Sequence, residues 1–166
     1  MTTREDFIRA MRTVAHSVTV VTTDGVDGRW GSTVSAFTSV SADPPSILVC
    51  LNAQSRIAAT VAANGRYAVN VLREGERVLA ERFAGKGVER DADRFEGVAL
   101  VEGAALPALA AAHTVFTCTV TETIPCGSHL IVIGAVDEAT SGACRPLTYL
   151  DGAYVAVIPH HSDDEG

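Results

Sequence analysis

The sequence is poor in aromatic residues and in positive charge. Aromatic residues make up 5% of the 166, with a single Trp, whereas hydrophobic residues as a whole make up 47%. The core must therefore be built mainly from Val, Ala, Leu and Ile, and a chain of this length can bury a sizeable core. Thirteen Lys and Arg stand against 20 Asp and Glu, which gives a net charge of −7 without a basic cluster. This balance argues against nucleic acid as a partner.

Sequence patterns for metal, dithiol and nucleotide-loop sites are also missing. None of the four cysteines lies in a CxxC pair, and Cys50 and Cys118 are expected to be buried because they sit in apolar runs. His160 and His161 are adjacent and would point to opposite faces of a strand, so we expect no metal site there. The glycines form neither a GxGxxG nor a Walker loop, which excludes the Rossmann and P-loop interpretations.

No apolar run approaches the ~18 residues that a membrane span requires. The opening residues Thr2–Asp6 are too polar for a signal peptide. We therefore expect a cytoplasmic protein with reduced thiols and no membrane partner. Neither an internal repeat nor a linker is visible, so we expect one domain over 1–166, with a core over about 7–158 and a disordered tail over 159–166.

The remaining pattern predicts a chain rich in strands. A first helix, capped by Thr2 or Thr3, should pack one apolar face on the core. That face consists of Phe7, Ala10, Met11 and Val14. Strands are predicted over 17–23, 29–40, 46–51, 67–72, 115–123, 130–138, 147–150 and 154–158, and further helices over 56–63 and 74–83. The strand over 46–51 is apolar throughout and is expected to be buried on both faces. Because short loops join adjacent strands, we expect an antiparallel barrel or sandwich with a few helices.

The most informative segment combines a hydroxyl-rich strand with a Pro-Pro corner. The hydroxyls belong to Ser32, Thr33, Ser35, Thr38 and Ser39. Pro44-Pro45 then forces a turn, because proline cannot continue a strand ladder. Hydroxyls and free backbone N–H groups are what a phosphate or a flat heteroaromatic ring requires. On the pattern alone, such a strand is equally an exposed edge or one face of a ligand site.

The segment 31–52, GSTVSAFTSVSADPPSILVCLN, resembles the signature of the short-chain flavin reductases, the reductase components of two-component flavin-dependent monooxygenases. Further stretches match the family pattern in the same order: FAGK over 83–86, GSHLIVIGAV over 127–136, and PLTY over 146–149 with Tyr154 close behind. The resemblance runs from about Phe7 to Val157. It implies a mainly β fold, an antiparallel Greek-key split barrel of roughly six strands with a few flanking helices, and usually a homodimer.

The resemblance also implies where a flavin binds. In the family, the hydroxyl-rich strand runs along the isoalloxazine ring, and the corresponding residues are Thr33, Val34, Ser35, Ala36 and Ser39. The turn after the next strand serves the ribityl-phosphate, and its residues are Leu51, Asn52, Ser55 and Arg56. This turn has a physical basis of its own, because a helix N-terminus presents unpaired N–H groups and partial positive charge. A simple strand end followed by a helix cap explains the same residues equally well.

The helix end over 83–86 contributes Phe83, Ala84, Gly85 and Lys86. Taken alone it is a helix C-terminus with Gly in the position after the cap. The resemblance places Lys86 near the flavin phosphate, or near the AMP half of a bound FAD. Trp30 and Tyr154 are expected to be structural, and Tyr154 is also assigned to the border of the flavin pocket or to a subunit interface.

His129 is assigned to the nicotinamide side of the site. The family pattern commonly reads Gly-Asp-His before the Ile/Val-rich strand, with the His near the nicotinamide. Here Ser128 replaces that Asp and removes a carboxylate that would favour the charged form of the imidazole. We therefore expect His129 to contact nicotinamide or flavin and not to act as a base, since hydride transfer requires alignment but no proton-abstracting side chain.

The leading hypothesis is an NAD(P)H:flavin oxidoreductase that passes hydride to FMN or FAD and supplies reduced flavin to a separate monooxygenase. FMN is favoured over FAD, and NADH over NADPH because no Arg cluster marks a 2′-phosphate site. Two alternatives stay open: a split-barrel flavoprotein that holds FMN tightly and acts on another substrate, and a flavin carrier without catalysis. NADH oxidation that saturates with free flavin distinguishes the reductase from both.

Overall fold

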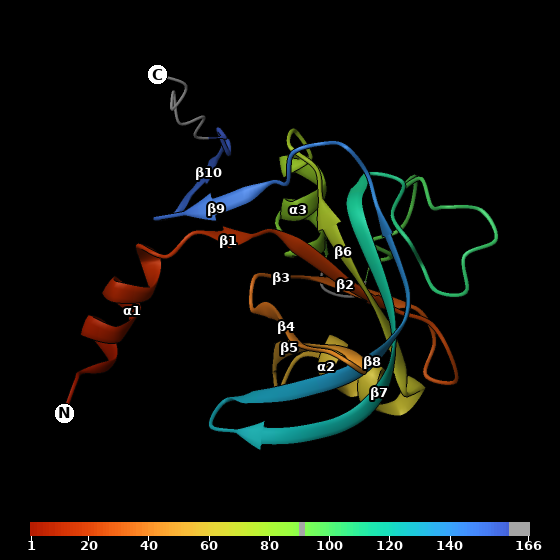
Figure 1. The fold of residues 1–166 in the computed structure, drawn as a ribbon, viewed down its shortest axis with the longest axis horizontal. Helices are drawn as coiled ribbons and strands as arrows, with labels where there is room; N and C mark the ends of the chain where they lie inside the picture. Colours follow the sequence, from red (N-terminus) through yellow and green to blue (C-terminus); the bar gives the residue numbers. More distant parts are fainter. Residues whose placement is uncertain (90–91, 160–166) are drawn as a thin grey trace.

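The computed structural model describes residues 1–89 and 92–159, whose strands form two antiparallel sheets (Figure 1). The strands are β1 His16–Ser17, β2 Thr19–Thr23, β3 Trp30–Val34, β4 Phe37–Ala42, β5 Pro45–Asn52, β6 Arg66–Leu72, β7 Ala112–Cys126, β8 His129–Ser141, β9 Thr148–Leu150 and β10 Ala153–Val155. The helices are α1 Arg4–Arg12, α2 Arg56–Asn64 and α3 Arg77–Phe83. The larger sheet has the order β3-β2-β6-β7-β8-β5-β4 and the smaller one β1-β9-β10. A mainly β, antiparallel fold with a few helices is thus confirmed.

The single strand predicted over 29–40 is wrong, because the chain breaks there into β3 and β4. β3 pairs with β2, whereas β4 pairs with β5, and these two strands form the opposite ends of the seven-stranded order. Ser35 and Ala36 make the crossing, and the Ala36 carbonyl accepts a hydrogen bond from the Cys50 N–H at 3.0 Å. The break therefore brings the two ends of the sheet together, and the hydroxyl-rich segment lies at this closure.

Two clusters of apolar side chains hold the fold together. The first contains Val21, Val49, Val69 and Val132 from four strands, together with Ile57 from α2. The second packs under α3 and is built from Val18, Val20, Leu72, Ala80, Phe83, Phe95, Leu109 and Leu147. Burying a Val, Leu or Phe side chain contributes about 1.5–3 kcal/mol relative to exposure. The aliphatic composition is therefore sufficient for a core, and the buried aromatic side chains are divided between the two clusters, with Trp30 and Tyr67 in the first and Phe83 and Phe95 in the second.

The strand β5 is buried on one face only, which corrects the expectation of burial on both. Ile47, Val49 and Leu51 are buried, whereas the alternating Leu48 and Cys50 are only half-buried. Cys118, by contrast, is fully buried, as expected from its apolar run. An apolar run indicates a buried strand, but it does not report whether a second layer covers the other face.

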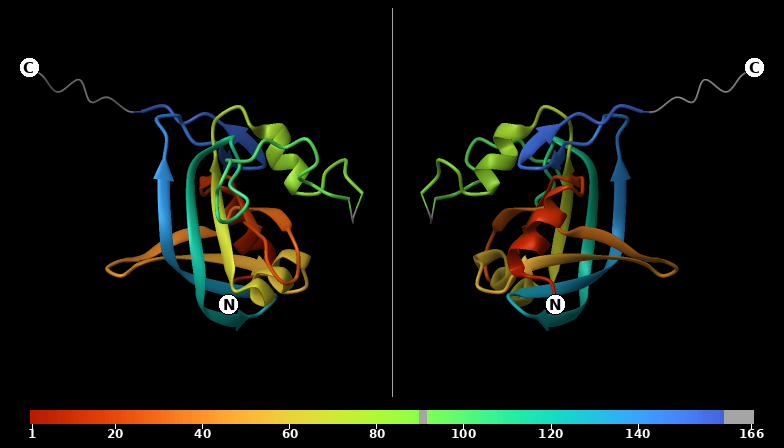
Figure 2. Two further views of the ribbon diagram at one scale, coloured as in Figure 1. Left: turned by 90° about the vertical axis from the view of Figure 1, so that its right-hand side faces the viewer. Right: turned by 90° about the vertical axis from the view of Figure 1, so that its left-hand side faces the viewer.

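The first helix forms as predicted but does not pack on the core. Thr3 caps α1 by accepting a hydrogen bond from the Asp6 N–H, yet no residue of α1 is buried. Phe7 keeps 57% of its surface exposed and Met11 keeps 40%. Figures 1 and 2 show α1 standing to one side of the barrel, next to the small sheet. The helix is amphipathic as predicted, but none of the described residues buries its apolar face.

Other elements follow the sequence closely. Ser55 caps α2 and Gly65 ends it in the left-handed conformation, at φ 67°. The last hairpin turns at Asp151-Gly152, as expected. The β7–β8 hairpin extends further at both ends than its β-branched runs predicted. His160 and His161 lie outside the described residues. No helix in the described part of the chain has the length and apolarity that crossing a membrane requires.

Candidate functional site

Two adjoining pockets lie where β3, the end of β5 and the N-terminus of α2 meet. The inner pocket has a volume of about 250 Å³ and the outer pocket about 470 Å³. Ser32, Ser55 and Ile57 line both, so the two pockets form one continuous groove. Small-molecule sites typically span roughly 300–1,000 Å³. The groove as a whole is therefore large enough for a nucleotide, which the inner pocket alone is not.

The inner pocket collects most of the predicted ring-binding residues. Its lining consists of Ser32, Thr33, Val34, Ser35, Ala36, Cys50, Leu51, Asn52, Ser55, Ile57 and His129. Ser35 and Ala36 are exposed at the crossing between β3 and β4, and Leu51 and Asn52 end β5. The sequence interpretation missed Ser32, Cys50 and Ile57 as wall residues. Ser32 lies on β3, Cys50 on β5 and Ile57 in the first turn of α2, and these elements meet at one pocket only because of the break between β3 and β4.

The N-terminus of α2 forms the floor between the two pockets. Ser55 caps the helix by accepting a hydrogen bond from the Ala58 N–H at 3.4 Å, and its own hydroxyl donates to the Asn52 carbonyl at 2.6 Å. The Asn52 side chain accepts a further bond from the Gln54 N–H at 2.9 Å. The interpretation of Ser55 as a helix cap is therefore confirmed. This cap is compatible with a ligand site, because the first turn of a helix still offers N–H groups without intrahelical partners.

A tryptophan and two arginines form the wall of the outer pocket. The guanidinium carbon of Arg56 lies 3.9 Å from the centre of the Trp30 ring, and that of Arg94 lies 4.9 Å from it. Arg94 is fixed by two bonds from its Nη1, to the Phe83 carbonyl at 2.6 Å and to the Gly31 carbonyl at 3.2 Å. Burial lowers the pKa of Arg94, and the nearby Arg56 charge adds to this effect. The pocket is consequently cationic in an otherwise acidic protein.

Sequence reasoning missed both Trp30 and Arg94 as site residues. Trp30 was expected to be structural, and Arg94 falls in a charged segment that predicted only a loop. Phe95, next to Arg94, anchors that segment by packing edge-on against Phe83, with the ring centres 5.0 Å apart. The Arg-Phe pair was the available signal, because a buried Phe fixes the direction of its neighbour. The sequence did not show that Arg94 would reach the Gly31 carbonyl on β3.

His129 lies at the rim of the inner pocket, at the first residue of β8. It is exposed, and it pairs across the sheet with Asn52. Its Nδ1 forms a hydrogen bond of 2.9 Å with the Ser128 hydroxyl. Ser128 therefore still orients the imidazole, although it supplies no charge. The assignment of His129 as a contact for nicotinamide stays a prediction, with the residue placed where such a contact would be made.

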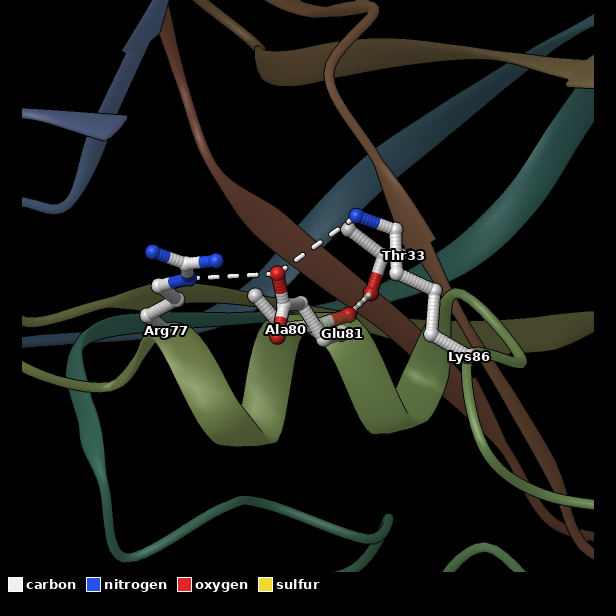
Figure 3. Close-up of polar contacts among 5 residues, drawn as sticks. All are labelled: Thr33, Arg77, Ala80, Glu81 and Lys86. Carbon is white, nitrogen blue, oxygen red and sulfur yellow. Dashed lines mark hydrogen bonds and ion pairs between the residues drawn. The ribbon is translucent and has the colours of Figure 1, made fainter. Parts of the chain in front are cut away.

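Three of the predicted flavin contacts have a side chain engaged inside the protein or lie outside both pockets. The Thr33 hydroxyl donates to the Ala80 carbonyl of α3 at 2.6 Å, so it is occupied inside the protein (Figure 3). Phe83 is completely buried and lines neither pocket. Ser39 is exposed in the middle of β4, away from both pockets. All three belong to stretches that match the family pattern. Phe83 packs in the core under α3, and Ser39 lies outside both pockets.

Lys86 is held by an acidic residue of α3. Its Nζ lies 3.4 Å from Glu81 Oε1, which also accepts a hydrogen bond from Arg77 Nε at 3.1 Å (Figure 3). The bond from Arg77 is the main cause of the lowered pKa of Glu81. Gly85, at φ 83°, has the Arg94 Nη2 atom 3.2 Å from the position that a Cβ would take. The Gly of the FAGK stretch therefore makes room for Arg94, while Lys86 lines neither pocket.

Tyr154 belongs to the small sheet and lines neither pocket. Its ring packs edge-on against Tyr149, with centres 5.2 Å apart, and the Arg77 guanidinium lies 5.5 Å from its centre. Partial burial raises the pKa of its phenol. Tyr154 therefore lies beside α3, and its assignment to the border of the flavin pocket or to a subunit interface stays a prediction. Among the described residues, no cluster of His, Cys, Asp or Glu is suited to a metal ion.

Comparison with known proteins identifies the family to which this chain belongs. Residues 11–157 match the family described as flavin reductase like domain. The chain is 37% identical over 156 residues to the FMN reductase (NADH) RutF of Ancylobacter novellus, covering 93% of this chain and 85% of that protein. It is 34% identical over 161 residues to the reductase component of the 4-nitrophenol 4-monooxygenase/4-nitrocatechol 2-monooxygenase of Rhodococcus opacus, covering 96% and 84%.

A solved structure agrees with these relatives. The flavin reductase PheA2 in its native state superposes with a TM-score of 0.85 at 30% identity, covering 95% of this chain and all of that one. The split-barrel architecture expected from the resemblance is thereby confirmed.

Proposed function

Because this chain belongs to the flavin reductase like domain family, we propose that it is an NADH-dependent flavin reductase that transfers hydride from reduced nicotinamide to FMN or FAD. The observation that carries the proposal is the continuous groove between the closure of the barrel and the N-terminus of α2. One end of this groove offers hydroxyls and backbone groups, and the other offers two arginines. A flavin nucleotide has the same polarity, with a ring at one end and phosphate at the other.

The residues of the groove fit a phosphorylated flavin. Arg56 and Arg94 form no ion pair within the described residues, and the α2 N-terminus adds unpaired N–H donors beside them. Donors of this kind bind phosphate oxygens by charge-assisted hydrogen bonds. When bound, the flavin supplies the hydride-accepting ring. The protein contributes binding and alignment, with Ser35 and Asn52 near the ring and His129 at the open rim where nicotinamide would enter.

NADH is proposed as the electron donor and not NADPH. From the sequence, NADH was favoured because no Arg cluster was visible, but in the structure Arg56 and Arg94 form such a cluster. That cluster lies at the α2 end of the groove, however, and His129 lies at the other end, beside the inner pocket. The names of the relatives also specify NADH.

We also propose a homodimer, in which a second copy covers the exposed apolar face of α1. A hollow of about 340 Å³ separates this face from the barrel and is lined by Phe7, Ile8, Met11, Val14 and Tyr149 among others. The hollow includes Ser35 and Ala36, so it adjoins the inner pocket. A surface of this kind costs free energy in water and marks an interaction site.

The reduced flavin is proposed to serve a separate monooxygenase, as the name of the Rhodococcus relative indicates for that protein. The cytoplasm is the proposed compartment, because all four cysteines are free and such thiols persist where the surroundings are reducing.

The test is NADH oxidation, followed by absorbance, with purified protein and increasing FMN or FAD. We expect a rate that saturates with free flavin. Clear flavin binding without NADH oxidation would instead identify a flavin carrier. Rapid bleaching of one tightly bound flavin per chain, without turnover of added flavin, would identify a split-barrel enzyme with another acceptor.

A further inference from the structure

The hollow beside α1 is a slot between a helix and the barrel. Its volume is about 340 Å³, and it is bounded by the apolar face of α1 and by the crossing at Ser35 and Ala36. Phe7, Met11 and Val14, which line it, keep 40–57% of their surface exposed. Apolar side chains exposed in this way cost free energy in water. An occupant of the slot must therefore be narrow, and it must be apolar at its end.

The β4–β5 hairpin has this shape. β4 forms one end of the seven-stranded order and pairs only with β5. In the right-hand view of Figure 2, where α1 faces the viewer, the orange hairpin projects sideways from the barrel. Its end over 40–45 reads VSADPP, in which Val40 keeps 49% of its surface exposed and residues 42–45 are all exposed. Proteins normally cover an edge strand of this kind, but the described residues leave this one uncovered.

The other hairpin ends fit the slot less well. The β2–β3 turn over 24–29 reads DGVDGR and carries two acids and an arginine. The β7–β8 turn is tied to its own chain, because the Ser128 carbonyl accepts a hydrogen bond from the Ala53 N–H at 3.0 Å. The β9–β10 turn already belongs to the slot, since Asp151 and Gly152 line it. Within 1–89 and 92–159, the β4–β5 hairpin is therefore the turn that is projecting, apolar and uncovered.

The charges of the hairpin and of α1 are complementary. Asp43 is the only charged residue over 37–52, and it forms no ion pair within the described part of the chain. On α1, Arg4 is unpaired in the same sense, and it precedes Phe7 by three positions, which places it on the apolar side of the helix. Arg12 and His16 also line the slot. An acidic hairpin end would thus meet basic groups around an apolar slot.

Deepening the proposed homodimer, and resting on the proposed reductase activity, we propose that the β4–β5 hairpin of each copy inserts into the slot of the other. The exchange is reciprocal, so one two-fold axis generates both contacts and the assembly closes as a dimer. Ser35 and Ala36 line the slot and the inner pocket alike. The partner's hairpin therefore forms a further wall beside these two residues, and two chains together complete the ring end of the groove.

The test uses two variants that disrupt opposite sides of the contact. Val40→Lys places a charge on the hairpin, and Met11→Glu places one on the wall of the slot. Both positions are exposed in the single chain, so neither change disturbs the core. Each variant alone should be monomeric in sedimentation velocity at concentrations where the wild-type protein is a dimer. An equal mixture of the two should form dimers again, because one contact is then wild type and the other joins Lys to Glu.

Val26→Lys is the matched control for the hairpin variant. Val26 is the same residue type, keeps 92% of its surface exposed at the end of the β2–β3 hairpin, and lines neither the slot nor the groove. This variant should stay dimeric. A dimer that persists in Val40→Lys, a mixture that stays monomeric, or a monomeric wild-type protein would overturn the reciprocal insertion.

Flavin binding by the same proteins tests whether the site needs two chains. The dissociation constant for FMN, measured through flavin fluorescence without NADH, should rise several-fold in monomeric Val40→Lys and recover in the mixture with Met11→Glu. An unchanged constant in the monomer would overturn the two-chain site. Absence of NADH oxidation by a dimeric, FMN-binding wild-type protein would instead refute the proposed reductase, and the sedimentation result would still decide the insertion.

Discussion

The Thr33 hydroxyl donates to the Ala80 carbonyl at 2.6 Å, and this bond ties the hydroxyl-rich strand β3 to the helix α3. The family motif marks Thr33 as a ring contact, yet its side chain is turned into the protein. The same segment therefore divides into residues that support the groove and residues that face it. Ser35, two positions later and exposed at the crossing to β4, belongs to the second kind.

Replacing Thr33 with Val should affect stability more than binding. The substitution keeps the shape of the side chain but removes one of the two donors to the Ala80 carbonyl, which still accepts a bond from the Ala84 N–H at 3.0 Å. We expect the free energy of unfolding to fall by about 1 kcal/mol, with the flavin dissociation constant changed less than about twofold. Chemical denaturation and flavin titration measure the two quantities. A large loss of flavin affinity at unchanged stability would show that the hydroxyl faces the ligand after all.

Replacing Ser35 with Val should weaken flavin binding, whereas Ser39→Val should not. Ser35 lines the inner pocket, and one lost hydrogen bond corresponds to about 1 kcal/mol, or several-fold in the dissociation constant. Ser39 shares the motif, the residue type and the exposure, but it lies outside both pockets, which makes it the matched control. Equal effects at the two positions would place the ring along β4 instead of at the crossing.

Replacing His129 with Ala should raise the KM for NADH several-fold, with flavin affinity close to normal. The imidazole lies at the rim of the inner pocket, where its loss removes a contact worth roughly 1 kcal/mol but leaves the groove intact. Steady-state kinetics at saturating flavin gives the KM, and a flavin titration without NADH gives the affinity. Ser128→Ala is the control for orientation and should produce a smaller increase, because Ser128 acts only through the imidazole. Loss of flavin binding in His129→Ala would show that this residue contacts the flavin and not the nicotinamide.

Gly134 is required by a close approach between β8 and the core. A Cβ at this position would lie 2.7 Å from the Tyr67 hydroxyl and 2.9 Å from the Cys118 Cβ. Gly134→Ala should therefore lower the free energy of unfolding by about 1–3 kcal/mol through overpacking. The double variant with Tyr67→Phe should recover part of this loss, because one of the close atoms is removed. Strict additivity of the two changes, measured by denaturation, would show that they do not meet.

The apolar face of α1 should control the oligomeric state. Phe7 and Met11 are exposed in the single chain, so Phe7→Glu together with Met11→Glu should convert the proposed dimer into monomers. Sedimentation velocity measures the change. The control is Arg9→Glu together with Arg4→Glu, which alters charge on the same helix without touching Phe7 or Met11. A monomeric wild-type protein, or a dimer that persists in the Phe7→Glu, Met11→Glu variant, would contradict the proposal that a second copy covers this face.

Much of the fold and part of the site could be predicted from sequence because the signals are local. The β-branched runs locate most strands, Ser55 and Gly65 mark the two ends of α2, and Asp151-Gly152 marks the last turn. The inner pocket was accessible for the same reason. Apart from His129, its residues lie in two short stretches, 32–36 and 50–57, and the family motif over 31–52 covers the first and the start of the second.

Other features depended on contacts between distant residues, which no local pattern encodes. The crossing at Ser35–Ala36 arises because β3 and β4 pair with strands at opposite ends of the sheet. Arg94 became a site residue because Phe95 packs under α3 and the carbonyls of Gly31 and Phe83 accept its bonds. The exposure of α1 follows from the hollow that separates its apolar face from the barrel, which the described residues leave unfilled. The sequence by itself determined the elements and the ring end of the groove. Only the tertiary structure decided its cationic end, because two arginines 38 positions apart meet there on one tryptophan.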